Sequence, residues 1–412
     1  MSRPRPGIGR RLLRALGGIL VILAITFAAL EVGLRLFPQA IPLAWLERFG
    51  DGVRTEVANR LGLPNADIVY LLARQDGGPP LRMYKPNAEV SLPTRSDGGP
   101  AAVRLDRNGF CNPDDAINAL AKVDLVAIGD SFTFCTKLAA ADTWPARLGA
   151  ASHRTVLNLG VPGVGIDEYL EVLRVFGLPR HPAVVILNIY EGNDLRDAVR
   201  YRDFVAEHRS GAPEKASRRS LVSGWLGRNS YAWNLIVSGI DAASGEIRRR
   251  RNPKGEIDFH YDLALADRTI AFNVENGDLD EVRSARGVAA GKLDPAWLDP
   301  GLERFAAQAR QSGFVPLVTY APAAYTAYDR FVKFSDPELA PLMAAYSRRL
   351  RDHLREACQR LGLRFVDLTP ALQAAAATSR EPLYGYANLH FTPAGTAVVA
   401  ATLAPVVEEL FR

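Results

Sequence analysis

Four separate places along this chain carry residues suited to nucleophilic catalysis. The first is the sequence VAIGDSFT over residues 126–133, in which an apolar run ends abruptly in Gly-Asp-Ser. We expect Ser131 to lie on the turn from a buried strand into a helix N-terminus, with its hydroxyl exposed and its backbone N–H unpaired. Such a turn suits a nucleophile, because the helix dipole and unpaired amides can stabilise an oxyanion. By itself the tripeptide is weak evidence, since Gly-Asp-Ser also occurs in ordinary turns.

The other three places supply groups that a serine nucleophile needs. The loop NLGVPG, residues 158–163, can bring a backbone amide close to a ligand at Gly160 or Gly163. The segment EGND, residues 191–194, adds the side-chain amide of Asn193, and NLHFTPAG, residues 388–395, sets His390 before the last helix. A nucleophile, two oxyanion donors and a base could therefore converge.

Strands that alternate with helices would position these groups. Short apolar runs predict five buried strands, and helical periodicity predicts five helices between and after them. The strands are at 123–128, 155–159, 183–189, 315–320 and 363–366, and the helices at 144–151, 166–176, 302–311, 342–361 and 393–410. This alternation predicts an α/β domain with a parallel sheet covered on both faces, whose sites form at the carboxyl ends of strands.

The alternation begins near residue 103 and is interrupted once. Residues 38–102 read as a lead-in segment, in which 41–49 are an interfacial segment or a first exported helix and 51–100 are mostly loops. Residues 103–412 read as the compact domain. Between about 201 and 298 the pattern stops, which indicates an insertion after the third strand that overhangs the site. The insertion includes Arg248–Arg251, a run whose default interpretation is a solvated loop.

The first 37 residues have the pattern of a membrane anchor. Residues 1–14 form a basic, acid-free leader, and residues 15–37 are apolar apart from Glu31 and Arg35, about the length that spans a bilayer. The positive-inside rule then keeps the N-terminus in the cytoplasm and exports the remaining chain. A cleaved signal peptide is the alternative, since Ala28-Ala29 offers small residues, but Glu31 and the continuing apolar run favour an uncleaved anchor.

Charge and cysteine content exclude other classes of site. The leader's five arginines account for the formal net charge of +5, so the remaining chain is balanced and gives no support for nucleic-acid binding. Cys111, Cys135 and Cys358 are too few and too scattered for a zinc site, and the sequence implies no metal and no cofactor.

The four blocks, in this order and spacing, resemble the SGNH hydrolases, also called the GDSL lipase/esterase family. The similarity extends to exported, membrane-anchored members, in which segments like NGF at 108–110 and TWP at 143–145 flank the serine block. It implies a three-layer α/β/α, flavodoxin-like fold over roughly residues 103–412. Carried over, Ser131 is the nucleophile and His390 the base, while the N–H groups of Ser131 and Gly163 and the amide of Asn193 form the oxyanion hole. Asp130 resembles the family's structural aspartate.

One position departs from the family pattern. The family usually has an aspartate two or three residues before the histidine, where this chain has Asn388 and Ala387. An Asn oxygen can accept the histidine's Nδ1–H but carries no charge, and in serine proteases the Asp-to-Asn change costs about ten-thousand-fold in kcat. A Ser-His dyad supported by a backbone carbonyl, or by Asp367 after the fifth strand, remains open.

The resemblance implies an exported serine esterase or acyltransferase anchored in the inner membrane, with its catalytic domain on the periplasmic side. The expected partner is an ester-bearing small molecule or an acylated polysaccharide. The favoured substrate class is a cell-envelope glycan that carries O-acetyl groups. Tyr325 and Tyr328 could line a sugar subsite, although packing is an equal alternative. The rival function is a catalytically weak or inactive protein that binds a glycan or an envelope partner through the same pocket.

Export also bears on the cysteines. Cys111 lies just before the first strand and Cys135 just past the nucleophile turn, whereas Cys358 falls in a helical pattern as a buried thiol. An oxidising compartment permits pairing, so we expect a disulfide between Cys111 and Cys135 that ties the lead-in to the active-site loop.

Overall fold

The computed structural model describes residues 8–46, 49–63, 69–72, 81–91, 102–209, 218–251, 261–264, 269–272, 280–386 and 389–412. The chain divides into two compact units. A helical unit comprises Met1–Asp67 and Ala212–Glu256, and a sheet unit comprises Ile68–Gly211 and Ile257–Arg412.

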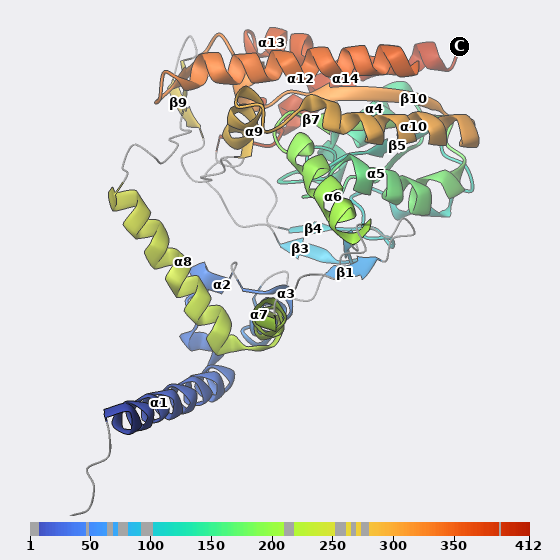
Figure 1. The fold of residues 1–412 in the computed structure, drawn as a ribbon. Coiled ribbons are helices and arrows are strands. Elements are labelled where there is room, and N and C mark those ends of the chain that lie inside the picture. Colours follow the sequence, from blue (N-terminus) through green and yellow to red (C-terminus); the bar gives the residue numbers. More distant parts are fainter. Residues whose placement is uncertain are drawn as a thin grey trace, which may run out of the picture. The chain divides into compact units, whose positions relative to one another are not determined.

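The sheet unit is built on five parallel strands in the order β12-β10-β7-β5-β6 (Figure 1). Their bounds are β5 Leu125–Ile128, β6 Val156–Asn158, β7 Val184–Tyr190, β10 Val315–Ala321 and β12 Arg364–Asp367. All five lie within a few residues of the predicted runs. Counted along the chain the order is 2-1-3-4-5, the flavodoxin-like arrangement, whose switch point lies between β5 and β7.

Helices cover this sheet, as the wholly buried strands β5, β6 and β7 require. One group that packs together is α5, α10 and α12, and another is α4, α13 and α14 (Figure 1). Their bounds are α4 Trp144–Ser152, α5 Ile166–Val172 with a π-helical continuation Leu173–Gly177, α6 Asp194–Arg209, α10 Asp299–Ser312, α11 Ala324–Ala327, α12 Leu339–Leu361, α13 Thr369–Ala376 and α14 Pro393–Leu410. The five predicted helices are therefore present.

Smaller antiparallel elements surround the sheet. The lead-in contributes two pairs, β1 Val69–Leu72 with β2 Leu81–Tyr84, and β3 Glu89–Ser91 with β4 Ala102–Arg104. A three-stranded sheet joins β8 Tyr261–Ala264, β9 Thr269–Phe272 and β11 Val332–Phe334, and α9 Asp280–Ala289 packs on α12. The lead-in thus contains regular structure that the Gly- and Pro-rich sequence did not indicate.

The helical unit joins the N-terminal segment to part of the predicted insertion. Its helices are α1 Ile8–Leu36, α2 Leu43–Leu46, α3 Asp51–Arg60, α7 Arg218–Asn229 and α8 Tyr231–Arg251. Here α8 packs on α1 and α2, and α7 packs on α3. The insertion is therefore shared between the two units, since its β8, β9 and α9 belong to the sheet unit. The run Arg248–Arg251, expected in a loop, ends helix α8.

Helix α1 is long and apolar enough to cross a membrane over Gly17–Leu36, the one such helix among the described residues. Most of this window is exposed, while Leu34 near its end is buried in the core of the helical unit with Val53, Val57 and Tyr231. The end of α1 is thus an integral part of that unit.

Candidate active site

The predicted nucleophile lies at the switch point of the sheet. Strand β5 ends at Ile128 and Ser131 follows in a tight turn, where a Cβ atom on Gly129 would stand 2.3 Å from the Thr133 hydroxyl. Residues 131–137 form successive turns, so the helix N-terminus expected after Ser131 is absent from this segment. Lys137 takes a left-handed conformation with φ 61°, which ends any helical course there. The N–H groups of Phe132, Thr133 and Phe134 all donate to Asp130, so they are not available to an oxyanion.

His390 meets Ser131 from the far end of the chain. Its Nε2 atom lies 2.8 Å from the Ser131 hydroxyl oxygen. The backbone around it is held by two bonds, from Gly385 N to the His390 carbonyl and from Leu389 N to the Gly385 carbonyl, each 2.8 Å. Leu389 has φ 61°, an uncommon and strained conformation for a leucine. Contacts elsewhere in the fold must offset this strain. The imidazole also stacks on Phe132, with ring centroids 4.9 Å apart, so its orientation is fixed by packing as well.

The three expected oxyanion donors come from loops after β5, β6 and β7. Among the described residues, neither the N–H of Ser131 nor that of Gly163 has a hydrogen-bond acceptor. Gly163 takes φ 74°, which glycine adopts readily. Asn193 donates one side-chain N–H to Asp197 at 2.7 Å, and an amide carries a second. Asp197 pairs with Arg200 at 3.2 Å, and Arg200 donates to the Gly163 carbonyl at 3.2 Å. One ion pair therefore links both donor loops.

Sequence analysis does not single out Asp197 or Arg200. They lie four and seven residues after Asn193 at the start of α6, a spacing that places all three on one face of a helix. If a helix had been predicted to begin at Asp194, the i, i+4, i+7 spacing of Asn193, Asp197 and Arg200 would have placed Asp197 and Arg200 beside Asn193.

Buried carboxyl groups lie behind the nucleophile turn. Burial, with a smaller effect of Asp197, raises the pKa of Asp130 to about 7, and burial beside Asp130 raises the pKa of Asp194 well above its ordinary value. One Asp130 oxygen accepts from Phe132 N at 2.8 Å, and among the described residues the other has no partner. Asp194 accepts from the Tyr169 hydroxyl at 2.5 Å. Asp130 therefore braces the turn, whereas Asp194 holds Tyr169 and the end of β7. No group of three or more described His, Cys, Asp or Glu residues could hold a metal.

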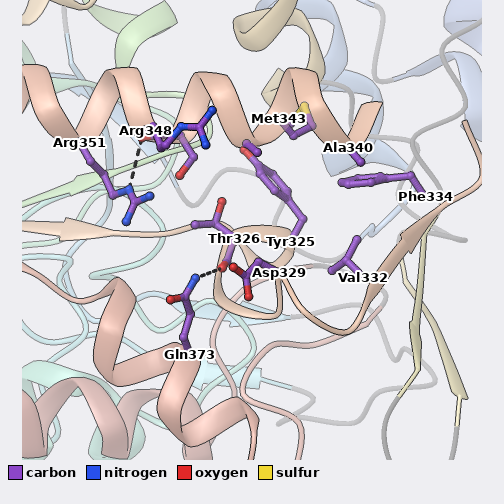
Figure 2. Close-up of a pocket in the computed structure, with 12 residues that line it drawn as sticks. Tyr325, Thr326, Asp329, Val332, Phe334, Ala340, Met343, Arg348, Arg351 and Gln373 are labelled. Carbon is purple, nitrogen blue, oxygen red and sulfur yellow. Dashed lines mark hydrogen bonds between the residues drawn. The ribbon is translucent and has the colours of Figure 1, made fainter. Parts of the chain in front are cut away.

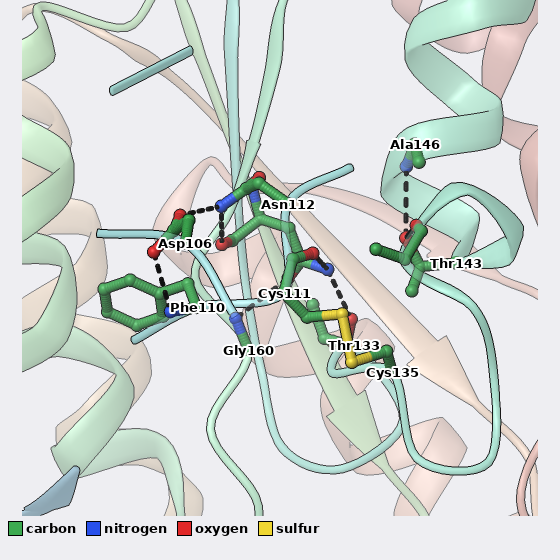
Figure 3. Close-up of a disulfide and its surroundings, with 11 residues drawn as sticks. Asp106, Phe110, Cys111, Asn112, Thr133, Cys135, Thr143, Ala146 and Gly160 are labelled. Carbon is green, nitrogen blue, oxygen red and sulfur yellow. Dashed lines mark hydrogen bonds between the residues drawn. A yellow bond between two sulfur atoms is a disulfide. The ribbon is translucent and has the colours of Figure 1, made fainter. Parts of the chain in front are cut away.

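The segment between β4 and β5 is fastened to this turn covalently and by polar contacts (Figure 3). The expected disulfide is present between Cys111 and Cys135, whose Cα atoms are 6.0 Å apart. Asn158 donates to the Thr133 carbonyl at 2.9 Å, and its backbone N–H donates to Asn112 at 2.8 Å. Asn112 in turn donates to the buried carboxylate of Asp106 at 2.8 Å. Cys358 is a buried free thiol, as expected, and burial raises its pKa to about 12.

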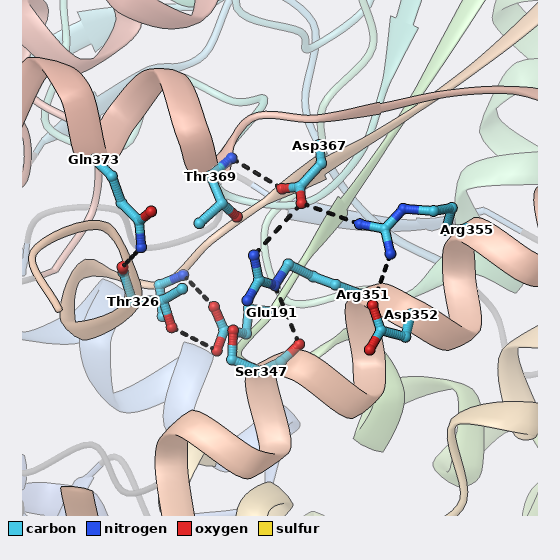
Figure 4. Close-up of polar contacts among 10 residues, drawn as sticks. Glu191, Thr326, Ser347, Arg351, Asp352, Arg355, Asp367, Thr369 and Gln373 are labelled. Carbon is cyan, nitrogen blue, oxygen red and sulfur yellow. Dashed lines mark hydrogen bonds and ion pairs between the residues drawn. The ribbon is translucent and has the colours of Figure 1, made fainter. Parts of the chain in front are cut away.

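The structure does not bring Asp367 to His390. One Asp367 oxygen accepts from Thr369 N at 2.9 Å, and the other lies 3.5 Å from Arg351 and 3.6 Å from Arg355 (Figure 4). The described contacts of this carboxylate therefore serve β12 and α12. Asn388, the other residue expected to orient His390, lies outside the described residues.

The two tyrosines expected at a sugar subsite differ in their surroundings. Both are buried, with Tyr325 5% and Tyr328 2% exposed. Tyr325 donates its hydroxyl to the buried Glu191 at 2.8 Å, and Tyr328 accepts from Leu383 N at 2.7 Å. The packing alternative therefore fits Tyr328, whereas Tyr325 also lines a pocket.

This pocket has a volume of about 230 Å³ and lies beside α11 and α12, after β10 (Figure 2). Its lining is partly apolar and partly polar: Tyr325, Thr326, Asp329, Val332, Phe334, Ala340, Met343, Ala344, Ser347, Arg348, Arg351 and Gln373. Thr326, like Tyr325, donates to Glu191, at 2.9 Å, so the pocket wall is bonded to the segment that carries Asn193.

Comparisons with known proteins give one family and several distant structures. The chain is similar in fold to an alpha/beta hydrolase enzyme from the metagenome of Lake Arreo, Spain, with 14% identity, 71% of this chain and 97% of that chain covered, and TM-score 0.36. It is also similar to a variant of an acetyl-xylooligosaccharide esterase from Geobacillus Stearmophilus, with 11% identity, coverage of 70% and 96%, and TM-score 0.36. These similarities are too low to bear on substrate. No curated protein matches the sequence. Residues 127–398, however, match the sequence profile of one family over most of the sheet unit, so the chain belongs to the GDSL-like lipase/acylhydrolase family.

Proposed function

We propose that this protein is a serine ester hydrolase or O-acyltransferase that uses Ser131 and His390. The observation that carries the proposal is the 2.8 Å contact between the Ser131 hydroxyl and Nε2 of His390, residues 259 positions apart. A nucleophile and a base within hydrogen-bond reach are the minimum for acyl transfer by serine. Membership of a lipase/acylhydrolase family supports the same chemistry.

The reaction follows from the two groups and the three donors. Ser131 Oγ attacks the acyl carbonyl carbon while His390 Nε2 takes the hydroxyl proton. The N–H groups of Ser131 and Gly163 and the amide of Asn193 stabilise the oxyanion. Collapse of the intermediate breaks the bond to the alcohol oxygen, which receives the proton from His390. Water then releases the acyl group in a hydrolase, or a sugar hydroxyl accepts it in a transferase.

The substrate class we favour is an O-acetylated glycan of the cell envelope, reached from an inner-membrane anchor with the sheet unit on the periplasmic side. Helix α1 supports an uncleaved anchor, because it continues unbroken past Ala28 and Ala29 to Leu36. Leu34 is buried in the helical unit, which a removable signal peptide would not explain. The Cys111–Cys135 disulfide suits an oxidising compartment.

The pocket lined by Tyr325 is our candidate for holding a sugar unit of the substrate. Arg348, Asp329 and Gln373 offer donors and acceptors for hydroxyl groups, and Tyr325 and Phe334 offer aromatic surface. Arg348→Ala should raise KM for an acetylated oligosaccharide severalfold and leave KM for a short model ester unchanged. Arg349→Ala, an exposed neighbour outside the pocket lining, is the matched control. Equal effects on both substrates would argue against the subsite.

The second candidate function is a binding protein with little turnover. It is favoured by the neutral Asn388 at the usual position of the aspartate and by the commitment of Asp367 to two arginines. Labelling with a fluorophosphonate distinguishes the two, since only an activated serine reacts. We expect labelling of the full chain and none of Ser131→Ala or His390→Ala. An unlabelled parent that binds acetylated glycans without releasing acetate would replace the enzyme proposal with the binding one.

A further inference from the structure

Helix α8 carries an outward stripe of large apolar side chains. Trp233, Ile236, Val237 and Ile240 are spaced i, i+3, i+4 and i+7, which places them on one face of the helix. Ile236, Val237 and Ile240 are 38%, 36% and 58% exposed, and Trp225 on the neighbouring α7 is 58% exposed. A contiguous apolar stripe on a water-facing helix is unusual and indicates an interaction surface.

A different face of α8 already packs within the helical unit. Tyr231 and Ala232 are fully buried with the end of α1. Asn234 fixes the same side by accepting from Gly50 N at 2.8 Å and donating to the Ser230 carbonyl at 2.7 Å. The stripe is therefore additional to the surface that the unit needs for its own core.

The start of α8 is bonded to the membrane-spanning helix through one carboxylate. Glu31 of α1 accepts from the Ser230 hydroxyl at 2.8 Å and from Ala232 N at 2.9 Å. A carboxylate at a helix N-terminus is stabilised by the unpaired N–H groups there. Arg35 adds a bond to the Asn229 carbonyl at 2.6 Å and lies over the Tyr231 ring at 4.7 Å. The first turn of α8 is thus held at the level of Glu31.

In a membrane that α1 crosses with its uncharged residues in the hydrocarbon, that level would be the outer surface of the bilayer, although the longer stretch Gly17–Leu36 is also apolar on average. Residues 15–30 carry no charge, and at about 1.5 Å per residue they span about 24 Å of a hydrocarbon core that is about 30 Å thick. Glu31 is the first charged residue beyond them, so it stands at the boundary between acyl chains and headgroups. Figure 1 shows α8 running crosswise to α1 from this point, which carries it along the surface of a membrane that α1 spans.

We propose that α8 lies in the headgroup layer of the outer leaflet, with its apolar stripe against the phospholipid of the membrane in which α1 is anchored. Tryptophan favours this layer, and helices with one apolar face and basic residues bind it. The proposal rests on the anchoring part of the proposed function, and it extends the membrane contact from one helix to two.

Spin labels on the full chain in phospholipid nanodiscs test this surface. Ile236→Cys and Ile240→Cys place labels on the stripe, Ile22→Cys reports on the anchor, and Ala345→Cys, exposed on α12, is the water-facing control. We expect the stripe labels to resemble the Ile22 label, with accessibility to oxygen several times that to a water-soluble nickel complex, and the control label to show the reverse.

Three results would overturn the proposal. Stripe labels as accessible to nickel as the control would show that the stripe faces water. Stripe labels shielded from both reagents would show that protein covers it, either a second copy or the sheet unit. An Ile22 label accessible to nickel would show that α1 is not in the bilayer. Both the membrane anchor and the proposal for α8 would then be wrong, whereas the proposed esterase activity would be unaffected.

Discussion

In the proposed mechanism Asp197 positions Asn193, and its effect can be separated from that of the proposed catalytic groups. Its side chain is mostly buried, 10% exposed, and accepts from the Asn193 amide at 2.7 Å. A hydrogen bond to a charged group contributes about 1.5–3 kcal/mol, and losing one oxyanion donor costs about 10²–10³ in kcat. Asp197→Ala leaves the donor in place but removes what orients it. We therefore expect kcat to fall roughly 10- to 100-fold.

The kinetic pattern should identify the step that is affected. The oxyanion exists only in the transition state and the intermediate, so kcat and kcat/KM should fall together while KM stays constant. Asp197→Asn retains an acceptor oxygen without the charge and should recover part of the loss. Arg200→Ala removes the exposed partner of Asp197 together with an exposed bond to the Gly163 carbonyl, and it should reduce kcat by no more than a few fold. Steady-state hydrolysis of a chromogenic acetyl ester provides these numbers.

A double-mutant cycle between Asp197 and Asn193 can refute the positioning role of Asp197. If Asp197 acts through Asn193, then Asp197→Ala should have little further effect once Asn193→Ala has removed the donor. An undiminished loss in the Asn193→Ala background would mean that Asp197 acts elsewhere, for example through the buried Asp130. A rise in KM with unchanged kcat would also refute the reasoning, because it would indicate ground-state binding.

Three further predictions concern the turn and its surroundings. Asn388→Asp should raise ester turnover roughly tenfold or more, about 1.4 kcal/mol of barrier, if residue 388 orients His390; an unchanged rate would assign that role to another group. Asp130 holds its proton more tightly when folded, with a pKa of about 7 against an ordinary 3.8, so the free energy of unfolding should fall as pH rises from about 4 to about 7 and then level. Urea unfolding at several pH values in this range should show that the free energy of unfolding depends less steeply on pH in Asp130→Asn than in the parent. An identical pH dependence would contradict the raised pKa of Asp130. The disulfide between Cys111 and Cys135 closes a segment of sequence separation 24, so its reduction should lower the free energy of unfolding by about 3 kcal/mol. The double serine variant should show the same loss with or without reductant.

Much of the sheet unit follows from local pattern. A parallel strand is covered on both faces, so all seven residues of 184–190 are buried and nearly all are apolar. Such an apolar run is visible in the sequence. Parallel strands also place their carboxyl ends at one edge, so Ser131 and Asn193, which follow β5 and β7, had to lie near each other at the switch point. The family pattern then identified His390 at the end of the chain as the base.

Only the tertiary structure decided which polar side chains meet. Asp367 could be placed at the end of a strand from its sequence, but its contacts with Arg351 and Arg355 depend on how α12 packs. Tyr325 and Tyr328 are both buried and similar in sequence context, yet Tyr325 lines the pocket beside α11 and α12 while Tyr328 accepts from Leu383 N, because the contacts of each ring are set by residues distant in the sequence.

The helical unit shows most clearly the difference between what local sequence specifies and what long-range packing decides. The apolar span of α1 and the charge of Glu31 are plain in the sequence, since both are local properties. The bond from Glu31 to Ser230, across 199 residues, is not, because no local pattern specifies which helix N-terminus a carboxylate will cap. The sequence by itself therefore determined the strands, the order of the chemical groups and the apolar helix. Folding determined the partners of each charge, since those partners are chosen by long-range packing.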